Sequence, residues 1–335
     1  MSKKVAVVIL NWNGKKFLEQ FLPSVTKHST NAQIIIIDNY STDDSTAFIR
    51  TNYPEVRLVL LDKNYGFSGG YNKGLKQIDS EYFVLLNSDV EVTENWLTPM
   101  IKLLDSDLSI AACQSKIKDF NNKSYFEYAG ASGGFIDKYG YPFCRGRIFE
   151  TLEEDKNQYD DAIEIFWASG ACLFIRSEQY HNIGGLDEFF FAHMEEIDLC
   201  WRLKNEGYKI MVCPSSTVYH VGGATLNKVN PQKTFLNFRN SLLTLHKNLP
   251  KKNRFGIIFT RLCLDGIAGM KFLISGKPNH TWAIVRSHFS FYSAISQNKT
   301  KRKQANNPNL VGIINKSVVK AYFLKKCKTF NTFVK

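Results

Sequence analysis

Carboxylate and amide side chains directly follow three apolar runs in the first ninety residues. Asn11 comes after VAVVIL, and Asp38 ends the run QIIIID. Asn87, Ser88 and Asp89 come after EYFVLL. A continuous apolar run with aromatic and β-branched members is typical of a strand buried on both faces. Asn, Ser and Asp are also common turn formers, so the last of these segments, taken alone, favours a simple turn.

A second set of acids, Glu195, Glu196 and Asp198, lies at the start of the predicted helix MEEIDLCWRLKNEGY. Acids are common in a first helical turn because they interact favourably with the helix dipole. Asp198 has Arg202 four residues later, which is an ordinary helical ion pair. Glu196 has no such partner, and a carboxylate beside aromatic residues at a helix start is suited to act as a general base.

His220 ends the apolar segment TVYH and precedes two glycines. A lone histidine at a strand end is more often structural than functional. Together with Asp89, however, it would form the mixed carboxylate and imidazole site that divalent metals accept. The two residues are far apart in the sequence, so their spacing leaves this pairing open.

The segment NYGFSGGYNKG is rich in glycine, with Gly66, Gly69, Gly70 and Gly74. Glycines let the backbone approach a phosphate, and the N-terminus of the following helix favours an anion. The pattern is neither a Rossmann fingerprint nor a Walker loop, and it follows the third strand rather than the first. A tight helix–strand connection explains these glycines equally well.

Strand-like and helix-like patterns alternate through the first hundred residues. Strands are expected at residues 4–10, 33–38, 56–61 and 81–86, with helices between them. This alternation predicts an α/β fold with a doubly wound, mostly parallel central sheet. Ligands bind at the carboxyl ends of strands in such sheets, so the polar groups that follow the strands are expected around one crevice.

The alternation ends near residue 100. GASGGFIDKYGYPFCRG is expected to form a loop or hairpin, and IEIFWASGACLFIRSE a strand, a turn at Ser169 and Gly170, and a second apolar run. KIMVCPSSTVYHVGG is expected to form two short strands.

Composition is ordinary for a globular protein of 335 residues, with 44% hydrophobic and 22% charged residues. Seven cysteines without a CxxC pair fit reduced thiols in a cytosol and argue against a disulfide framework or a zinc site. The apolar run near the start has only six residues, which is too short for a signal peptide. A cytoplasmic protein is therefore expected.

The net charge of +12 is unevenly distributed. Residues 251–335 hold 17 of the 43 Lys and Arg residues but only one of the 31 acids, Asp265. The chain therefore has a nearly neutral body and a basic tail, and such a tail is expected to meet an anionic partner, either nucleic acid or a membrane surface.

Residues 254–277 of the tail have an apolar run that is long enough to span a membrane, but Arg261, Asp265 and Lys271 interrupt it. Arg254, Arg261 and Asp265 are spaced to share one helix face, and the other faces are apolar. A helix lying in the membrane interface fits this pattern, and the basic runs NKTKRK and LKKCK favour an anionic surface. The alternative is a helix packed on the rest of the protein.

Five segments in order, VAVVILNWNG, IIIIDNYSTDDS, NYGFSGGYNKG, YFVLLNSDV and FFAHMEEIDLCWRLKNEGY, resemble the family 2 glycosyltransferases of the GT-A fold. The resemblance covers roughly residues 4–250 and is greatest to the bacterial rhamnosyltransferase-like enzymes of surface polysaccharide synthesis. No single segment is specific for this family, but the five segments in this order are.

The resemblance implies a role for individual residues. Asp38 would bind the nucleotide base, and Asn87-Ser88-Asp89 stands where the family has a DxD motif. Asn replaces the first acid, so Asp89 is the better ligand for Mg²⁺ or Mn²⁺, with His220 as a further ligand. Glu196, where the family usually has Asp, would be the base, with Glu195 and Asp198 beside it. The remaining residues expected to bind the donor are Leu10, Asn11, Asn13, Asn64, Gly66, Gly70, Asn72, Asn87 and Ser88.

The resulting hypothesis is an inverting, metal-dependent glycosyltransferase. It would use a dTDP- or UDP-linked sugar and a glycan or lipid-linked acceptor at the inner face of the membrane, without nucleic acid. Residues 1–250 would be the catalytic domain, with a nucleotide-binding half (1–100) and an acceptor half (101–250), and residues 251–335 a basic helical extension. The alternatives are a nucleotidyltransferase that makes an activated sugar, a non-catalytic partner or nucleic-acid-binding protein, and a nicotinamide-dependent oxidoreductase, which the missing fingerprint disfavours.

Overall fold

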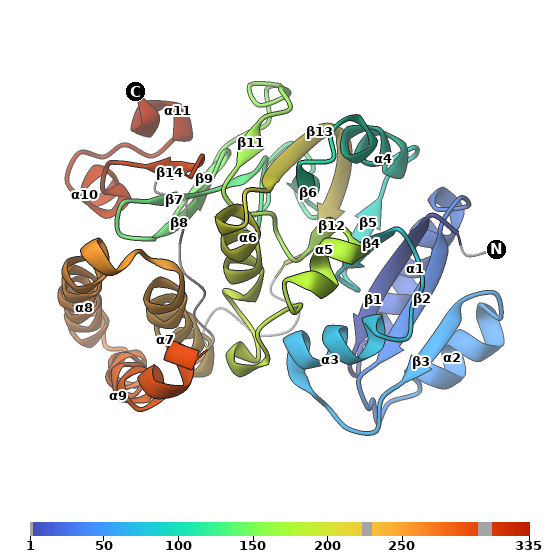
Figure 1. Cartoon of the computed structure of the whole chain (residues 1–335), viewed down its shortest axis with the longest axis horizontal. Coiled ribbons are helices and arrows are strands. Elements are labelled where there is room, and N and C mark those ends of the chain that lie inside the picture. The colour runs from blue at the N-terminus through green and yellow to red at the C-terminus, as the bar shows by residue number, and fades with distance from the viewer. Residues whose placement is uncertain (1–2, 223–229, 301–309) are drawn as a thin grey trace.

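The computed structural model describes residues 3–222, 230–300 and 310–335, and it contains two sheets and a layer of long helices (Figure 1). The strands of the large sheet are β1 (Val5–Asn11), β2 (Gln33–Asp38), β3 (Arg57–Leu60), β4 (Tyr82–Leu86), β5 (Val90–Val92), β6 (Ile110–Asp119), β11 (Glu164–Ile165), β12 (Cys172–Arg176) and β13 (Lys209–His220). The small sheet contains β7 (Gly134–Asp137), β8 (Pro142–Cys144), β9 (Arg147–Ile148), β10 (Thr151–Leu152) and β14 (Ile313–Ile314).

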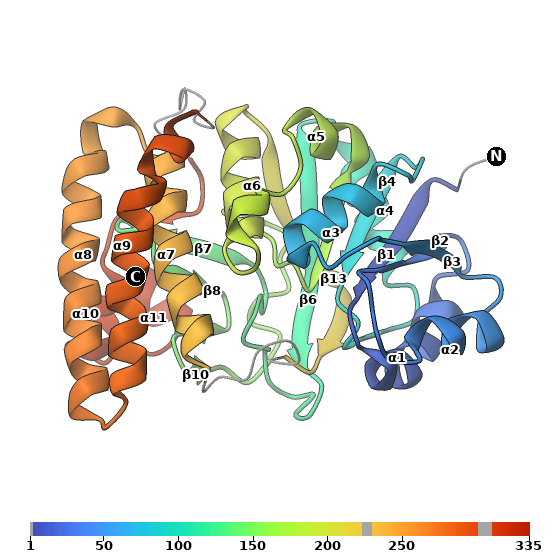
Figure 2. The ribbon, with the colours of Figure 1, turned by 90° about the horizontal axis from the view of Figure 1, so that it is seen from below.

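Helices cover both sheets and form a separate layer. They are α1 (Lys15–His28), α2 (Ser45–Asn52), α3 (Gly66–Leu75), α4 (Leu97–Ser106), α5 (Ser177–Asn182), the 3₁₀ turn η1 (Glu188–Phe190), α6 (Glu195–Asn205), α7 (Pro231–Asn248), α8 (Lys251–Ile274), α9 (Pro278–Thr300), α10 (Val318–Phe323) and α11 (Phe330–Val334). Figure 2 shows α7, α8 and α9 side by side at the end of the molecule opposite to β2 and β3.

The predicted parallel sheet is present in the first hundred residues. β3, β2, β1 and β4 lie next to one another in that order and are all parallel. Their apolar side chains pack on both faces of the sheet, so β4 is buried along its whole length. In the β1–β2 register, Asn11 lies opposite Asp38, which brings two of the predicted polar residues to one edge.

The second half of the large sheet is mixed. β12 is antiparallel to both β4 and β6, and β13 is parallel to β6. Residues 209–220 were expected to form two short strands, but they form the single strand β13, so this prediction is wrong. The register shifts between Cys213 and Thr217, where a bulge takes up extra residues without ending the strand.

Two glycines of the segment NYGFSGGYNKG bring α3 against the sheet. A Cβ at Gly74 would lie 2.1 Å from Ile37 Cδ1, and one at Gly70 would lie 2.7 Å from Leu10 Cδ1. Helix and strands can therefore be this close only because side chains are missing at these positions. These contacts account for Gly70 and Gly74 by packing, as the alternative interpretation of the segment proposed.

The C-terminal 85 residues make two kinds of contact with the body. α8 and α9 pack with α7, whereas β14 pairs with β7 and the Phe330 ring packs 4.9 Å from that of Phe135. The proposed boundary at residue 250 falls between α7 and α8 and stays a prediction. None of the helices in the described residues has the length and apolar character needed to cross a membrane.

Candidate functional site

Asn11 and Asp38 form a buried pair at the carboxyl edge of the parallel sheet. Asn11 Nδ2 donates to Asp38 Oδ1 at 3.0 Å and to Ser41 Oγ at 3.1 Å. Asp38 Oδ2 accepts from the Ser41 backbone N–H at 2.9 Å. Asn11 Oδ1 is buried and has no hydrogen-bond partner among the described residues, which leaves an acceptor for a ligand.

Asn39, which the sequence analysis did not single out, joins β2 to the start of α3. Its Nδ2 donates to Asn64 Oδ1 and to the Gly66 carbonyl, each at 3.0 Å. Gly66 has φ of +70°, and a Cβ there would lie 2.6 Å from the Phe191 ring. The predicted residues Asn64 and Gly66 therefore sit between the strand edge and the segment that precedes α6.

Other residues predicted to bind the donor have their side chains occupied within the protein. Asn13 Oδ1 accepts from the Thr42 backbone N–H at 2.7 Å. Asn72 donates to the Leu186 carbonyl and accepts from Tyr180 and the Leu186 N–H. Asn72 therefore holds the loop before α6, and any effect that it has on a donor is indirect. Ser88, next in sequence to Asn87, lies close to Gly14 at the start of α1.

Asp89 and His220, which are 131 residues apart in sequence, meet because β5 pairs with β13. His220 Nε2 lies 3.1 Å from Asp89 Oδ1 and 3.4 Å from Asn87 Nδ2. Its Nδ1 lies 3.3 Å from Oε2 of Glu127, a residue that the sequence analysis missed. All three charged side chains are buried, so the structure confirms the proximity of Asp89 and His220 and adds a second carboxylate.

The charge around His220 favours a cation. Burial lowers the pKa of the imidazole, but Glu127 and Asp89 oppose this effect and raise it to about 10. A carboxylate behind a histidine, as Glu127 is here, orients metal-binding imidazoles in many proteins. Among the described residues, no group of three or more His, Cys, Asp and Glu side chains could hold a metal. Asp89 and His220 are a fitting but incomplete ligand set, which other oxygen ligands would have to complete.

Glu195 and Glu196 begin α6, as predicted, and each has a buried Oε2 without a hydrogen-bond partner among the described residues. Burial raises the pKa of Glu195 well above its usual range, and the neighbouring Glu196 charge adds to this. Burial also raises the pKa of Glu196 to about 7. A carboxyl group that titrates near neutral pH is suited to proton transfer.

The segment before α6 has an unusual backbone that helix α7 holds in place. Phe191, His193 and Met194 have φ of 63°, 69° and 75°, a region that side chains other than glycine seldom adopt. Asn240 of α7 lies within hydrogen-bond distance of three carbonyls in this segment, at 2.8 to 3.1 Å. Strained backbone of this kind persists only where surrounding contacts fix it, and it is frequent at functional sites.

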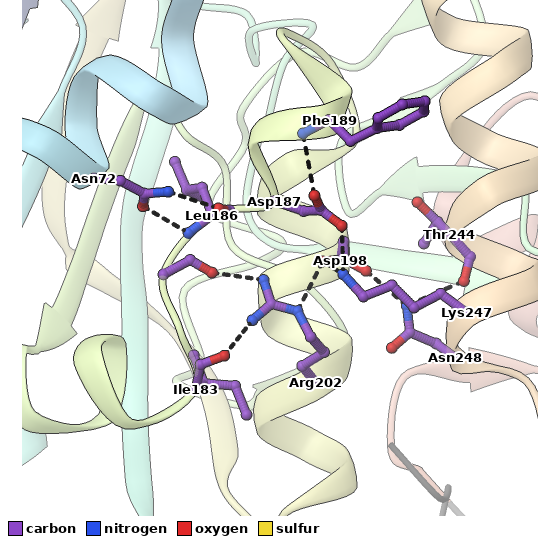
Figure 3. A network of polar contacts seen from close by, with 11 residues as sticks. Asn72, Ile183, Leu186, Asp187, Phe189, Asp198, Arg202, Thr244, Lys247 and Asn248 are labelled. Carbon is purple, nitrogen blue, oxygen red and sulfur yellow. Dashed lines mark hydrogen bonds and ion pairs between the residues drawn. The ribbon is translucent and has the colours of Figure 1, made fainter. Parts of the chain in front are cut away.

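Asp198 is part of a buried ion cluster between α6 and α7 (Figure 3). Its Oδ2 accepts from Arg202 Nε at 2.7 Å and from Lys247 Nζ at 2.8 Å, and its Oδ1 accepts from Asn248 at 2.8 Å. Burial opposes the charge, but Arg202 and Lys247 outweigh it and keep the pKa of Asp198 below its usual value. The predicted pair of Asp198 with Arg202 is confirmed, and the cluster gives Asp198 a structural role.

Comparison with known proteins gives a consistent result. The profile of "Glycosyl transferase family 2" matches residues 6–180. An N-acetylglucosaminyl-diphospho-decaprenol L-rhamnosyltransferase of Mycobacterium tuberculosis is 24% identical over 236 residues, which are 66% of this chain and 76% of the relative.

Solved structures share the fold. A mannosyltransferase of Pyrobaculum calidifontis in complex with GDP-Man and Mn²⁺ has a TM-score of 0.53 at 14% identity, over 90% of this chain and 87% of the other. GalNAc-T7 with UDP, GalNAc and Mn²⁺ has a TM-score of 0.57 at 16% identity, over 73% of this chain. The match spans about half of GalNAc-T7, 48% of that chain.

We expect Lys247→Met to destabilise the protein by about 3–5 kcal/mol, because it leaves two buried carboxylates, Asp187 and Asp198, without their shared cation. Urea unfolding followed by circular dichroism measures this change. The matched control is Lys209→Met, which removes a lysine from a partly exposed ion pair with Asp107. Equal stability of the two variants would contradict the structural role of Lys247.

Proposed function

Because the chain belongs to glycosyl transferase family 2, whose profile covers more than half of it, we propose that it transfers a sugar with inversion from a nucleoside-diphosphate donor, using a divalent cation. The protein is a glycosyltransferase with a GT-A-type fold, as the resemblance implied. The comparisons favour neither a nucleotidyltransferase nor a nucleic-acid-binding protein.

The observation that carries the proposal is the short connection between Glu196 and the group of Asp89, His220 and Glu127. The Asn87 backbone N–H donates to the Ala171 carbonyl at 3.0 Å, and a Cβ on the preceding residue, Gly170, would lie 4.0 Å from the Glu196 Cβ. A short bridge, residues 170–171, therefore links the candidate cation site to the candidate base.

Each part of this arrangement has a proposed task. Asp38 and the free oxygen of Asn11 would hold the nucleotide at the edge of β1 and β2. Asp89 and His220 would hold Mg²⁺ or Mn²⁺, with the donor diphosphate completing the ligand set. Bound there, the cation would offset the negative charge that develops on the leaving diphosphate.

Glu196 would take the proton from the acceptor hydroxyl. As the oxygen of the acceptor hydroxyl forms a bond to the anomeric carbon, the bond from that carbon to the diphosphate oxygen breaks, and the nucleoside diphosphate leaves. A single displacement of this kind inverts the anomeric centre. Glu196 is suited to it because its carboxyl group is partly buried, its Oε2 has no hydrogen-bond partner in the described part of the chain, and its pKa is about 7.

The names of the relatives suggest which donor and which acceptor to test first. The Mycobacterium tuberculosis relative is named as a rhamnosyltransferase, and its name gives a diphosphate-linked lipid as the acceptor. We therefore propose an activated rhamnose, linked to dTDP, as the first donor to test, with UDP-hexoses as the second. The proposed acceptor is a lipid-linked glycan.

The outer face of α8 and α9 supports docking on a membrane. On α8, Arg261 and Asp265 are buried against the body and pair with each other, so the polar side of the helix faces inward. The apolar side chains face solvent at spacings that place them on one stripe of each helix: Phe255, Phe259, Ile267, Met270 and Ile274 on α8, and Trp282, Val285, Phe289 and Tyr292 on α9.

So many exposed apolar side chains on two neighbouring helices are unusual for a protein surface and indicate an interaction site. Exposed Lys251, Lys252 and Lys277 stand at the ends of the same helices, and each lysine near an anionic leaflet adds about 1 kcal/mol of attraction. The basic run expected to help, residues 298–303, lies in part outside the described residues. We propose that this face places the protein on the inner leaflet, where a lipid-linked acceptor would be.

We expect Glu196→Gln to lower kcat by about 10²–10⁴ with little change in donor affinity, because the amide cannot accept a proton. The base must be ionised, so kcat/KM of the wild type should rise with pH through about 7 and level off above it. Steady-state rates from pH 5 to 9 measure both effects. Glu195→Gln is the matched control and should lower kcat less than Glu196→Gln. A larger loss of kcat in Glu195→Gln would place the base one residue earlier.

Asp89→Asn should abolish transfer and the Mn²⁺-dependent binding of a nucleoside diphosphate, because the amide replaces the only carboxylate proposed to contact the cation directly. His220→Ala should weaken the same binding less. Calorimetric titration of dTDP and UDP with and without Mn²⁺ measures both variants. Asp107→Asn, at a partly exposed acid that pairs with Lys209, serves as control, and undiminished cation-dependent binding by Asp89→Asn would end the assignment.

Full-length protein should co-sediment with vesicles that contain anionic lipid, and high salt should release part of it. The double substitution Phe255→Ser and Phe259→Ser should reduce the bound fraction severalfold, because it removes two exposed rings from the docking face. Leu108→Ser, at an equally exposed apolar residue next to α4, should bind as the wild type does. Equal binding of both variants, or none by the wild type at low salt, would refute membrane docking.

A further inference from the structure

Among the described residues, the buried guanidinium of Arg147 on β9 has no oxygen partner. Arg147 is only 6% exposed, and its Nε has no hydrogen-bond partner among the described residues. Nη2 donates to Cys144 Sγ at 3.5 Å, which is a weak contact. The guanidinium carbon lies 4.5 Å from the centre of the Tyr128 ring, so the arginine stacks on that ring.

The other buried cations of the described chain all have oxygen partners. Lys116 pairs with Asp155 and Asp160, Arg145 with Asp161, Lys204 with Glu164, Lys247 with Asp187 and Asp198, and Arg261 with Asp265, while Arg176 donates to the carbonyls of Ile110 and Leu104. Burial lowers the pKa of Arg147 and the charges of Cys144, Tyr128 and Glu127 raise it, but among the described residues Arg147 lacks the hydrogen-bonded or paired oxygen that every other buried cation has. An anion that binds from outside would complete it.

Arg147 lies near both halves of the candidate site. Its stacking partner Tyr128 follows Glu127, the carboxylate that contacts His220. Burial raises the pKa of the adjacent Cys144 thiol, Arg147 lowers it, and the charges of Glu127 and Glu196 raise it. Cys144 therefore lies within electrostatic reach of all three groups, and Arg147 contacts Cys144.

Arg147 belongs to a different sheet from the proposed donor contacts. Asn11, Asp38 and Asp89 belong to the first hundred residues and to the large sheet, whereas Arg147 lies on β9 of the small sheet. An anion at Arg147 would therefore lie on the small-sheet side of the candidate site. The proposed attacking hydroxyl is part of the acceptor, which has to bind next to Glu196. We therefore assign the anion at Arg147 to the acceptor.

We propose that Arg147 and Tyr128 form a subsite for a phosphate group of the acceptor, the one that links its sugar to a lipid. This inference rests on the proposed transferase function and adds to it the part of the acceptor that is recognised. The planar guanidinium presents parallel N–H donors that match two oxygens of a phosphate, and its stacking on the Tyr128 ring fixes its plane.

The test is calorimetric titration of farnesyl diphosphate in EDTA, so that no divalent cation can recruit a diphosphate to Asp89. Farnesol is the neutral probe. We expect the wild type to bind farnesyl diphosphate more tightly than farnesol, and Arg147→Met to weaken the diphosphate binding by about 10- to 100-fold, which is typical of a lost hydrogen bond to a charged group. Binding of farnesol should not change.

Arg145→Met is the matched control, because it removes a neighbouring buried arginine that already has a carboxylate partner, Asp161. It should bind farnesyl diphosphate within about twofold of the wild type. If Arg147→Met does not fold, Arg147→Lys decides the question, because lysine keeps the charge but loses the paired donors; a tenfold loss supports the subsite.

Equal affinity of the wild type and the Arg147 variant for farnesyl diphosphate would overturn the proposal, as would equal losses in the Arg147 and Arg145 variants. Mn²⁺-dependent binding of dTDP or UDP, measured on the same samples, tests the transferase proposal separately. A folded Arg147→Met that keeps this binding but loses farnesyl diphosphate supports the subsite. Wild-type protein that binds farnesyl diphosphate but no nucleotide would instead refute the donor site.

Discussion

Lys247 lies between the carboxylates of Asp187 and Asp198, 2.9 and 2.8 Å from their oxygens, in a region without solvent. Because an uncompensated charge there is costly, α6 and the loop before it can take their observed positions only when α7 supplies this lysine. Asn240 lies two turns earlier on α7. Its side-chain amide contacts backbone carbonyls of residues 190–193 and so holds their unusual conformation. The placement of Glu196 therefore depends on a helix that contributes no residue to the proposed chemistry.

This dependence connects the two ends of the molecule. α7 packs along α9, and α8 and α9 carry the apolar face proposed to meet a membrane. On α8 the polar pair of Arg261 and Asp265 is directed inward, where Arg261 donates to the Tyr139 carbonyl at 3.1 Å and to Ser241 of α7 at 2.7 Å. The helix thus reverses the usual arrangement of a surface helix, with charge inside and apolar side chains outside. One layer of helices anchors the loop before α6 and presents the proposed docking face.

The parallel part of the sheet is predictable from the sequence, because buried strands such as β2 and β4 are continuous apolar runs and end on polar residues. The proximity of Asn11 and Asp38 is predictable as well, since neighbouring parallel strands end at one edge. Glu127, Asn240 and Arg147 were missed, because their roles arise from contacts between segments that lack a periodic pattern. The single strand β13 was predicted as two, because a bulge interrupts its pattern without ending it.

The central claim is that a divalent cation and the donor diphosphate meet at Asp89 and His220, next to Glu196. The most direct measurement is an anomalous difference map from crystals grown with Mn²⁺ and dTDP or UDP, recorded at the manganese absorption edge. The account predicts one strong peak within bonding distance of the Asp89 carboxylate and of His220 Nε2, with diphosphate oxygens on its open side. A bound nucleotide whose diphosphate lies elsewhere, with no manganese peak between these two side chains, would contradict it.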